Sequence, residues 1–133
     1  MLRDCDAIER FLEARGRAFT KVNEATFLVT LAPAQPAAIL RVQPPVAVVQ
    51  VDVGDVVFRT LADECAFYKK LLELNANDLL HASYGLDNGR VQLSAALELD
   101  HLDDNELEAA LSDVALALGN HIPMLRKLVT AKA

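Results

Sequence analysis

The sequence lacks tryptophan and long apolar runs, and it holds only five Phe and two Tyr. Its hydrophobic residues, 53 % of the chain, are therefore almost all aliphatic, and 24 % charged residues is typical of a globular chain. No apolar run approaches the roughly 20 residues that a membrane-spanning helix needs. The start, MLRDCDAIER, is charged from its third residue, so we do not expect a signal peptide. We expect one domain over residues 1–133, in the cytoplasm and not bound to a membrane.

Cysteine and clustered positive charge are also scarce. Cys5 and Cys65 lie far apart and match no metal-binding or redox spacing, so we expect free thiols. The net charge is -6, and the basic pairs Lys69-Lys70 and Arg126-Lys127 do not form a stripe. Direct, charge-driven binding to nucleic acid is therefore not expected. An acidic balance suits a protein that keeps a hydrophobic partner in solution.

Motifs of common enzyme and metal sites are absent from the sequence. It contains no glycine-rich phosphate loop, no H-E-x-x-H and no G-x-S-x-G. The acids of the 100–104 segment could suggest a metal site, but helix capping explains them. We expect His121 to be exposed or capping, and Tyr68 and Tyr84 to be core or interface residues. The prediction is a protein without enzymatic activity, metal or cofactor.

The first half of the chain predicts one helix followed by strands. The helix spans about residues 4–15, with Asp4 as its N-cap and Gly16 as its end. Residues 17–58 are rich in Val, Thr, Phe and Ile, and apolar and polar side chains alternate there. Pro44-Pro45 cannot lie inside a central strand, so we place a turn or an edge at this pair. The pattern predicts a meander of three or four antiparallel strands.

A second helix is predicted to begin near Thr60, which can cap it together with Asp63. Its apolar residues form two stripes, namely Leu61, Cys65, Tyr68 and Leu72 in one and Phe67, Leu71 and Leu74 in the other. A helix that is apolar on two sides has two surfaces to bury. We expect the sheet to cover one and a second subunit to cover the other. The alternative is a single wide face that packs on the core.

The stretch HASYGLDNGRVQLSA, residues 81–95, is polar enough to suggest a reactive site, but a hairpin explains it better. Asn88-Gly89 favours a type I′ turn. Counting outward from this turn predicts an apolar face with the pairs Leu86–Val91, Tyr84–Leu93, Ala82–Ala95 and Leu80–Leu97. The other face then has the pairs Gly85–Gln92, Ser83–Ser94 and His81–Ala96. No acidic partner follows His81 to build a triad, so the stretch is predicted to be scaffold.

A third helix is predicted to open at Asp103, with Glu106 completing a capping box. Its apolar residues recur at helical spacing from Leu107 to Leu128. Pro123 lacks a backbone donor and clashes one turn back, so we expect a kink or a restart near residues 119–122.

The segment from about Leu61 to Val129 resembles the YbjN family and the class I, CesT-like type III secretion chaperones. The likeness rests on LLELN at 71–75, LDNGRV at 86–91 and LELDHL at 97–102. The resemblance implies an α+β fold in which an antiparallel sheet is flanked by three helices in the order α-β-β-β(-β)-α-β-β-α. It also implies a homodimer that holds a partner chain without ATP or chemistry, and it suggests a link to stress responses.

We therefore predict a non-enzymatic, homodimeric module that holds or regulates a client protein. The predicted dimer contacts are Phe67, Leu71 and Leu74, with the small residues Ser83, Ser94 and Ala96 close by. Two alternatives stay open. One is a regulator that acts with a DNA-binding or stress-response partner. The other is a metal- or small-ligand-binding domain that uses His81, His101 and Asp100.

Overall fold

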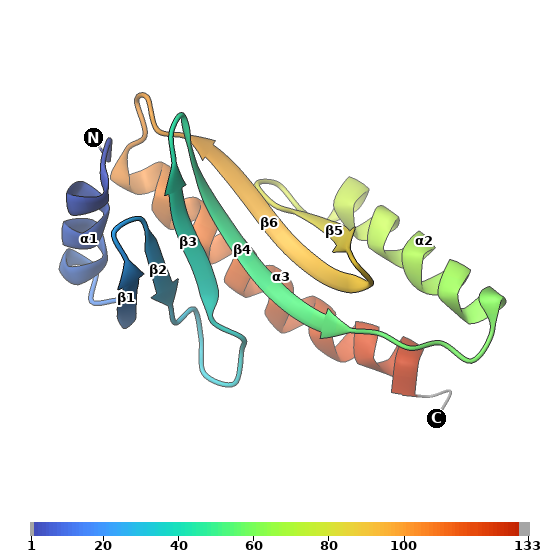
Figure 1. Ribbon diagram of the computed structural model, residues 1–133. Coiled ribbons are helices and arrows are strands. Elements are labelled where there is room, and N and C mark those ends of the chain that lie inside the picture. The colour runs from blue at the N-terminus through green and yellow to red at the C-terminus, as the bar shows by residue number, and fades with distance from the viewer. Residues whose placement is uncertain (1, 131–133) are drawn as a thin grey trace.

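The computed structural model describes residues 2–130, and it begins with a helix and a four-stranded meander (Figure 1). Helix α1 (Cys5–Ala14) starts where Asp4 accepts a hydrogen bond from the Ala7 N–H, and it stops before Gly16, whose φ is 68°. The strands are β1 (Phe19–Asn23), β2 (Thr26–Val29), β3 (Ala38–Gln43) and β4 (Val46–Asp55). Pro44-Pro45 forms the turn between β3 and β4, as the sequence predicts.

The second half adds α2 (Leu61–Asn77), the hairpin β5 (Ser83–Asp87) and β6 (Arg90–Glu98), and α3 (Asp104–Thr130). The antiparallel sheet has six strands in the order β1-β2-β3-β4-β6-β5. The predicted hairpin register is confirmed for the four pairs from Ser83–Ser94 to Leu86–Val91. The pairs predicted for residues 80–82 are wrong, because β5 begins only at Ser83 and these residues form the bend that follows α2.

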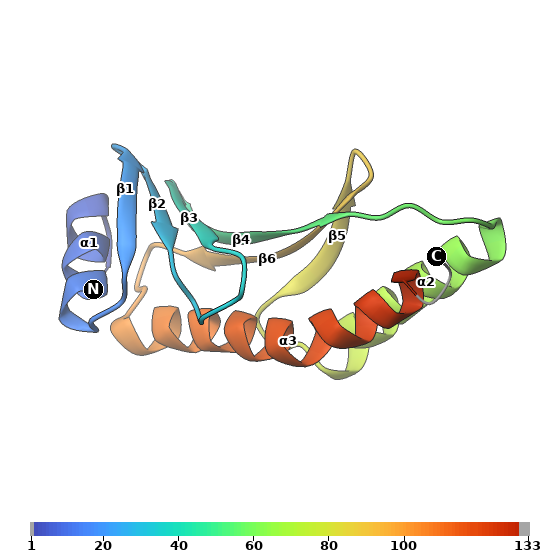
Figure 2. The ribbon, with the colours of Figure 1, turned by 90° about the horizontal axis from the view of Figure 1, so that it is seen from below.

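The helices cover only one face of the sheet. Figure 2 shows α2 and α3 below the strands, and α1 beside the β1 end of the sheet. The inward-facing side chains Phe27, Leu40, Val49 and Leu93 of four strands are fully buried, as are Leu107, Leu111 and Leu118 of α3. We call the side with α2 and α3 the inner face, and the opposite side, which carries no described helix, the outer face. The α+β fold is as predicted.

Helix α3 runs unbroken through Pro123, so of the two predicted alternatives, a kink or a restart near residues 119–122, the restart is wrong. Figure 2 shows that the helix axis bends in its second half, in agreement with a kink. Pro123 is exposed, while His121 and Leu125 on either side of it are buried. The packing of both flanks offsets the loss of one backbone hydrogen bond. The Gln35 amide also donates to the Ala115 carbonyl (3.0 Å) and so ties the β2–β3 loop to this helix.

No helix within residues 2–130 is both long and apolar enough to cross a membrane. Cys5 is half-buried and Cys65 is exposed, and both are free thiols.

The segment before β1 is tied to α3 by an ion pair. Arg17 donates to Glu108 through Nη2–Oε2 (2.6 Å) and Nε–Oε1 (3.4 Å). These hydrogen bonds hold the pKa of Glu108 below its usual value. A carboxylate with a depressed pKa stabilises the fold above its unfolded pKa of about 4.3, and this contribution is lost as pH falls through the folded pKa.

We expect Arg17→Gln to lower the free energy of unfolding at pH 7, and this difference from the wild type to shrink as pH falls below about 4. Urea denaturation over a pH series measures it. Arg10→Gln is the control, because Arg10 is exposed on α1. A difference that stays constant down to acidic pH would contradict the assignment.

Leu118→Ala should lower the free energy of unfolding by about 2–5 kcal/mol, because Leu118 is fully buried and its truncation leaves a cavity. Leu116→Ala, at a position 66 % exposed on the same helix, should change it by no more than about 0.5 kcal/mol. Equal effects of the two changes in urea denaturation would show that α3 packs through another face.

Candidate protein-binding site

The two apolar stripes of α2 have different environments. Phe67, Leu71 and Leu74 are 2 %, 6 % and 3 % exposed, so they pack into the core of the single chain. On the other stripe, Leu61 and Leu72 are 74 % and 68 % exposed. Cys65 is also exposed and Tyr68 is half-buried. The helix therefore leaves one apolar face uncovered, and we call Leu61, Cys65, Tyr68 and Leu72 the outer stripe.

The structure does not bring the six predicted dimer contacts together. Phe67, Leu71 and Leu74 lie on the inner side of the sheet, within the core. Ser83 and Ser94 are paired on β5 and β6, and their side chains alternate with the buried Tyr84 and Leu93, so they point to the outer face. Ala96 lies on that same outer face and is exposed. The sheet separates the two groups, so they cannot form one continuous contact surface. The contact role of the three small residues stays a prediction.

Exposed apolar side chains gather around α2. Eight large apolar residues are exposed among those described, and four belong to α2 or to the segments that flank it, namely Val57, Leu61, Leu72 and Leu80. Lone exposed apolar residues are ordinary, but Leu61 and Leu72 lie on the same face of α2, and an apolar face left in water is typical of a contact surface.

A groove lies beside α2, between the end of β4 and the second half of α3. Its volume is about 220 Å³, and its apolar lining includes Val53, Val56, Phe67, Val91, Ile122 and Leu125. Asp55 and Arg126 also line it. The ring of Phe58 packs on two rings of α2, with its centroid 5.3 Å from that of Phe67 and 5.8 Å from that of Tyr68. The groove thus combines an apolar lining with one acid and one base.

His121 is only 2 % exposed, so the expectation that it is exposed or capping is wrong. Its Nδ1 lies 2.8 Å from the Tyr84 hydroxyl, and its Nε2 lies 3.2 Å from the Asp78 carboxylate. A neutral imidazole satisfies both contacts, because Nε2–H donates to Asp78 while Nδ1 accepts from the Tyr84 hydroxyl. These partners remove the cost of burying the ring. Tyr84 and Asp78 are 37 and 43 residues away from His121 in the sequence, so no local sequence pattern could identify them as its partners.

This carboxylate–imidazole–hydroxyl order resembles a catalytic triad, but its hydroxyl belongs to a tyrosine that is only 7 % exposed. Burial, followed by the charge of Asp78, raises the pKa of Tyr84. The shallow cleft that reaches Asp78 and His121 is not lined by Tyr84. The arrangement therefore fastens β5 to α2 and α3.

Asn75 holds the backbone of the same tyrosine. The Tyr84 N–H donates to Asn75 Oδ1 (2.7 Å), and Asn75 Nδ2 donates to the Tyr84 carbonyl (3.2 Å). Tyr84 is thus fixed at three points, two on its backbone and one on its ring. These contacts join the end of α2 to strand β5.

The residues of the metal-site alternative do not converge. His101 Nε2 lies 3.5 Å from Asp100 Oδ2, and both side chains are exposed. The His81 N–H donates to Asp113 elsewhere. Within residues 2–130, no three His, Cys, Asp or Glu side chains are placed to hold a metal ion.

The geometry therefore offers apolar surfaces that could contact another protein. Comparison with known proteins also points to a protein-binding family. The sequence model of the CesT_Tir_1 family matches residues 1–131. The chain belongs to the CesT_Tir_1 family. A search of curated protein sequences found no match.

Two solved structures are similar in fold to this CesT_Tir_1 member. One is a chain of the heterodimeric ExoU–SpcU complex from the type III secretion system of Pseudomonas aeruginosa, with a TM-score of 0.69, 19 % identity, and coverage of 93 % of this chain and 98 % of that chain. The other is YbjN from E. coli, with a TM-score of 0.66, 12 % identity, and coverage of 91 % and 94 %. The predicted resemblance to YbjN and to type III secretion chaperones is confirmed at the level of fold.

Tyr84→Phe should lower the free energy of unfolding by about 1–3 kcal/mol, because it leaves Nδ1 of the buried His121 without a partner. Tyr68→Phe is the matched control: its hydroxyl lies 3.4 Å from Glu64 at a partly buried position, so its removal should cost much less. Urea denaturation at pH 7 compares them. If both variants lose the same stability, His121 does not depend on Tyr84.

Proposed function

We propose that the protein is a non-enzymatic, chaperone-like module that forms a homodimer in the cytoplasm and holds or regulates a client protein. The observation that carries this proposal is the outer stripe of α2, which leaves large apolar side chains in water on an otherwise well-packed chain. Membership of the CesT_Tir_1 family supports the chaperone-like part. The ExoU–SpcU complex, in which a chain of similar fold is bound to a second protein, supports the client part.

The outer stripe is suited to pairing with a second copy. It extends from Leu61 to Leu72, which is about 16 Å of helix. Burying an exposed leucine contributes about 1.5–3 kcal/mol, and a two-fold axis would bury each position twice. The buried stripe cannot do this, because its side chains already fill the core.

Binding rather than chemistry is supported by the state of the polar groups. The Tyr84 hydroxyl and the His121 ring are hydrogen-bonded to each other, and both side chains are buried. The groove beside α2 is lined mainly by aliphatic side chains. Such a surface recognises apolar side chains of another chain.

Leu72→Asp should convert the dimer to a monomer while leaving the fold intact, because it places a charge in the proposed contact at an exposed position. The neighbouring Leu71→Asp should instead unfold the chain, because Leu71 is buried in the core. Light scattering over a dilution series gives the mass, and circular dichroism gives the fold.

Leu28→Asp is a control for a charge introduced at an exposed leucine on the other half of the sheet. It should change neither the mass nor the fold. A Leu72→Asp protein that keeps a dimeric mass would remove α2 from the contact. A wild-type protein that is monomeric at every concentration would contradict the homodimer.

A further inference from the structure

We propose that two copies dock reciprocally, with Val57 and Leu61 of each copy seated in the groove beside α2 of the other. The inference rests on the proposed homodimer and specifies how its two chains interlock. It adds a contact that the outer stripe alone does not supply, and it gives the groove an occupant.

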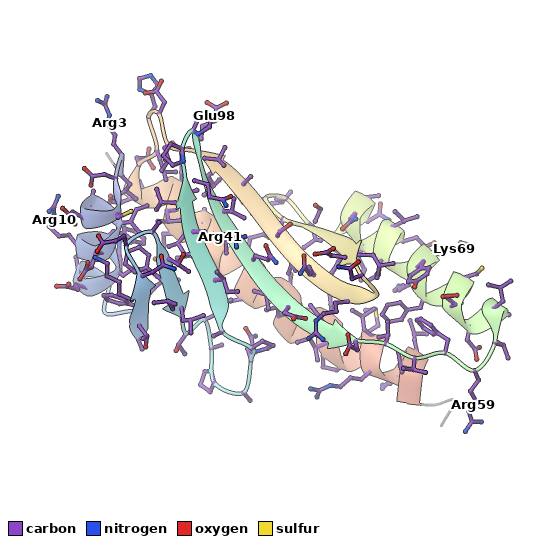
Figure 3. All side chains as sticks on the ribbon, in the orientation of Figure 1. Arg3, Arg10, Arg41, Arg59, Lys69 and Glu98 are labelled. Atoms are coloured by element: carbon purple, nitrogen blue, oxygen red, sulfur yellow. The ribbon has the colours of Figure 1, made fainter. Side chains whose placement is uncertain are left out.

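The projecting part is the segment that joins β4 to α2. Val57 is 83 % exposed, and Leu61 at the start of α2 is also exposed. Figure 1 shows that this segment extends beyond the end of β4, and Figure 3 shows Arg59 projecting from it, away from the body of the molecule. Nothing described within the chain covers these two apolar side chains.

The receiving part has a matching size and character. The groove measures about 220 Å³ and is lined mainly by aliphatic side chains. A protein cavity of about 150 Å³ holds a benzene molecule, so this groove has room for one or two branched aliphatic side chains.

The projection and the groove are neighbours, which makes a reciprocal contact possible. Val56 lines the groove, and the next residue, Val57, is almost wholly in water. A two-fold axis that passes between two adjacent features places each feature of one copy on the other feature of its partner. The contact is therefore closed at two chains.

The charges around the two parts are complementary. The rim of the groove has the basic residue Arg126, and α3 has no acidic residue after Asp113. The first turn of α2, next to the projection, is acidic with Asp63 and Glu64. In the reciprocal arrangement the acidic turn of one copy faces the basic rim of the other.

A second pair of opposite charges has its acid in the groove and its base on the projecting segment. Asp55 lines the groove, where it also pairs with Arg90 of its own chain (2.9 Å), and Arg59 follows Val57 by two residues on the projection. An interface that pairs opposite charges on both flanks of an apolar contact selects one register between the copies.

Light scattering and sedimentation over a dilution series test the arrangement with the full chain. Val57→Asp should raise the dimer Kd by at least about a factor of ten, because it places a charge in an apolar groove. Val22→Asp, at an exposed valine on β1, is the matched control and should leave the Kd unchanged.

Charge reversal supplies a second, independent test. Arg126→Glu and Glu64→Arg should each weaken the dimer, and the double variant should recover most of the wild-type Kd. Circular dichroism confirms that each variant is folded. A double variant no tighter than the singles would overturn the proposed register.

The outcomes separate this inference from the proposed function. If the wild type is a dimer that Leu72→Asp dissociates, but Val57→Asp and the charge reversals leave the Kd unchanged, the reciprocal docking is wrong and the homodimer stands. If the wild type is monomeric at every concentration, both fail.

Discussion

The packing of α3 against the inner face of the sheet is the interaction on which the rest of the structure depends. Leu107, Leu111 and Leu118 are fully buried against side chains from the central strands. The segment before α3 also holds the N-terminal segment in place, because the Leu2 N–H donates a hydrogen bond to the Leu102 carbonyl (2.7 Å). With α3 occupying the middle of this face, only the part near β5 is left for α2 (Figure 2). The helix can therefore bury one stripe there, and its second stripe has no partner within the chain.

Much of the fold could be predicted from the sequence, because its signals are local. The helix starts at Asp4, Thr60 and Asp103 each follow from a side-chain oxygen that accepts a backbone N–H three residues on. The hairpin register follows from Asn88-Gly89, whose positive φ angles of 51° and 80° belong to the tight turn. These interactions span few residues, so neighbouring sequence is enough to identify them.

The candidate site depends on contacts that local sequence does not encode. Both stripes of α2 are apolar, and which of them enters the core is decided by the position of α3 and the sheet. The two groups of predicted contacts lie on opposite faces of the sheet, which could not be predicted because the sequence does not show which face α2 covers. His121 lies two residues before a proline in the sequence, yet distant partners at the end of α2 and on β5 make it a buried residue. A long, well-packed helix also tolerates Pro123, which a sequence window treats as a break.

The clasp between Asn75 and Tyr84 has a consequence for how the sheet ends. β5 is an edge strand, and an edge strand presents unpaired N–H and carbonyl groups that can template the addition of another chain. The Tyr84 N–H and carbonyl are instead occupied by the Asn75 side chain, which takes the place that a seventh strand would fill. An incoming strand would have to displace both hydrogen bonds before it could pair at this point. A single amide thus blocks the addition of another strand at this point of β5, about one helix turn from the exposed Leu72.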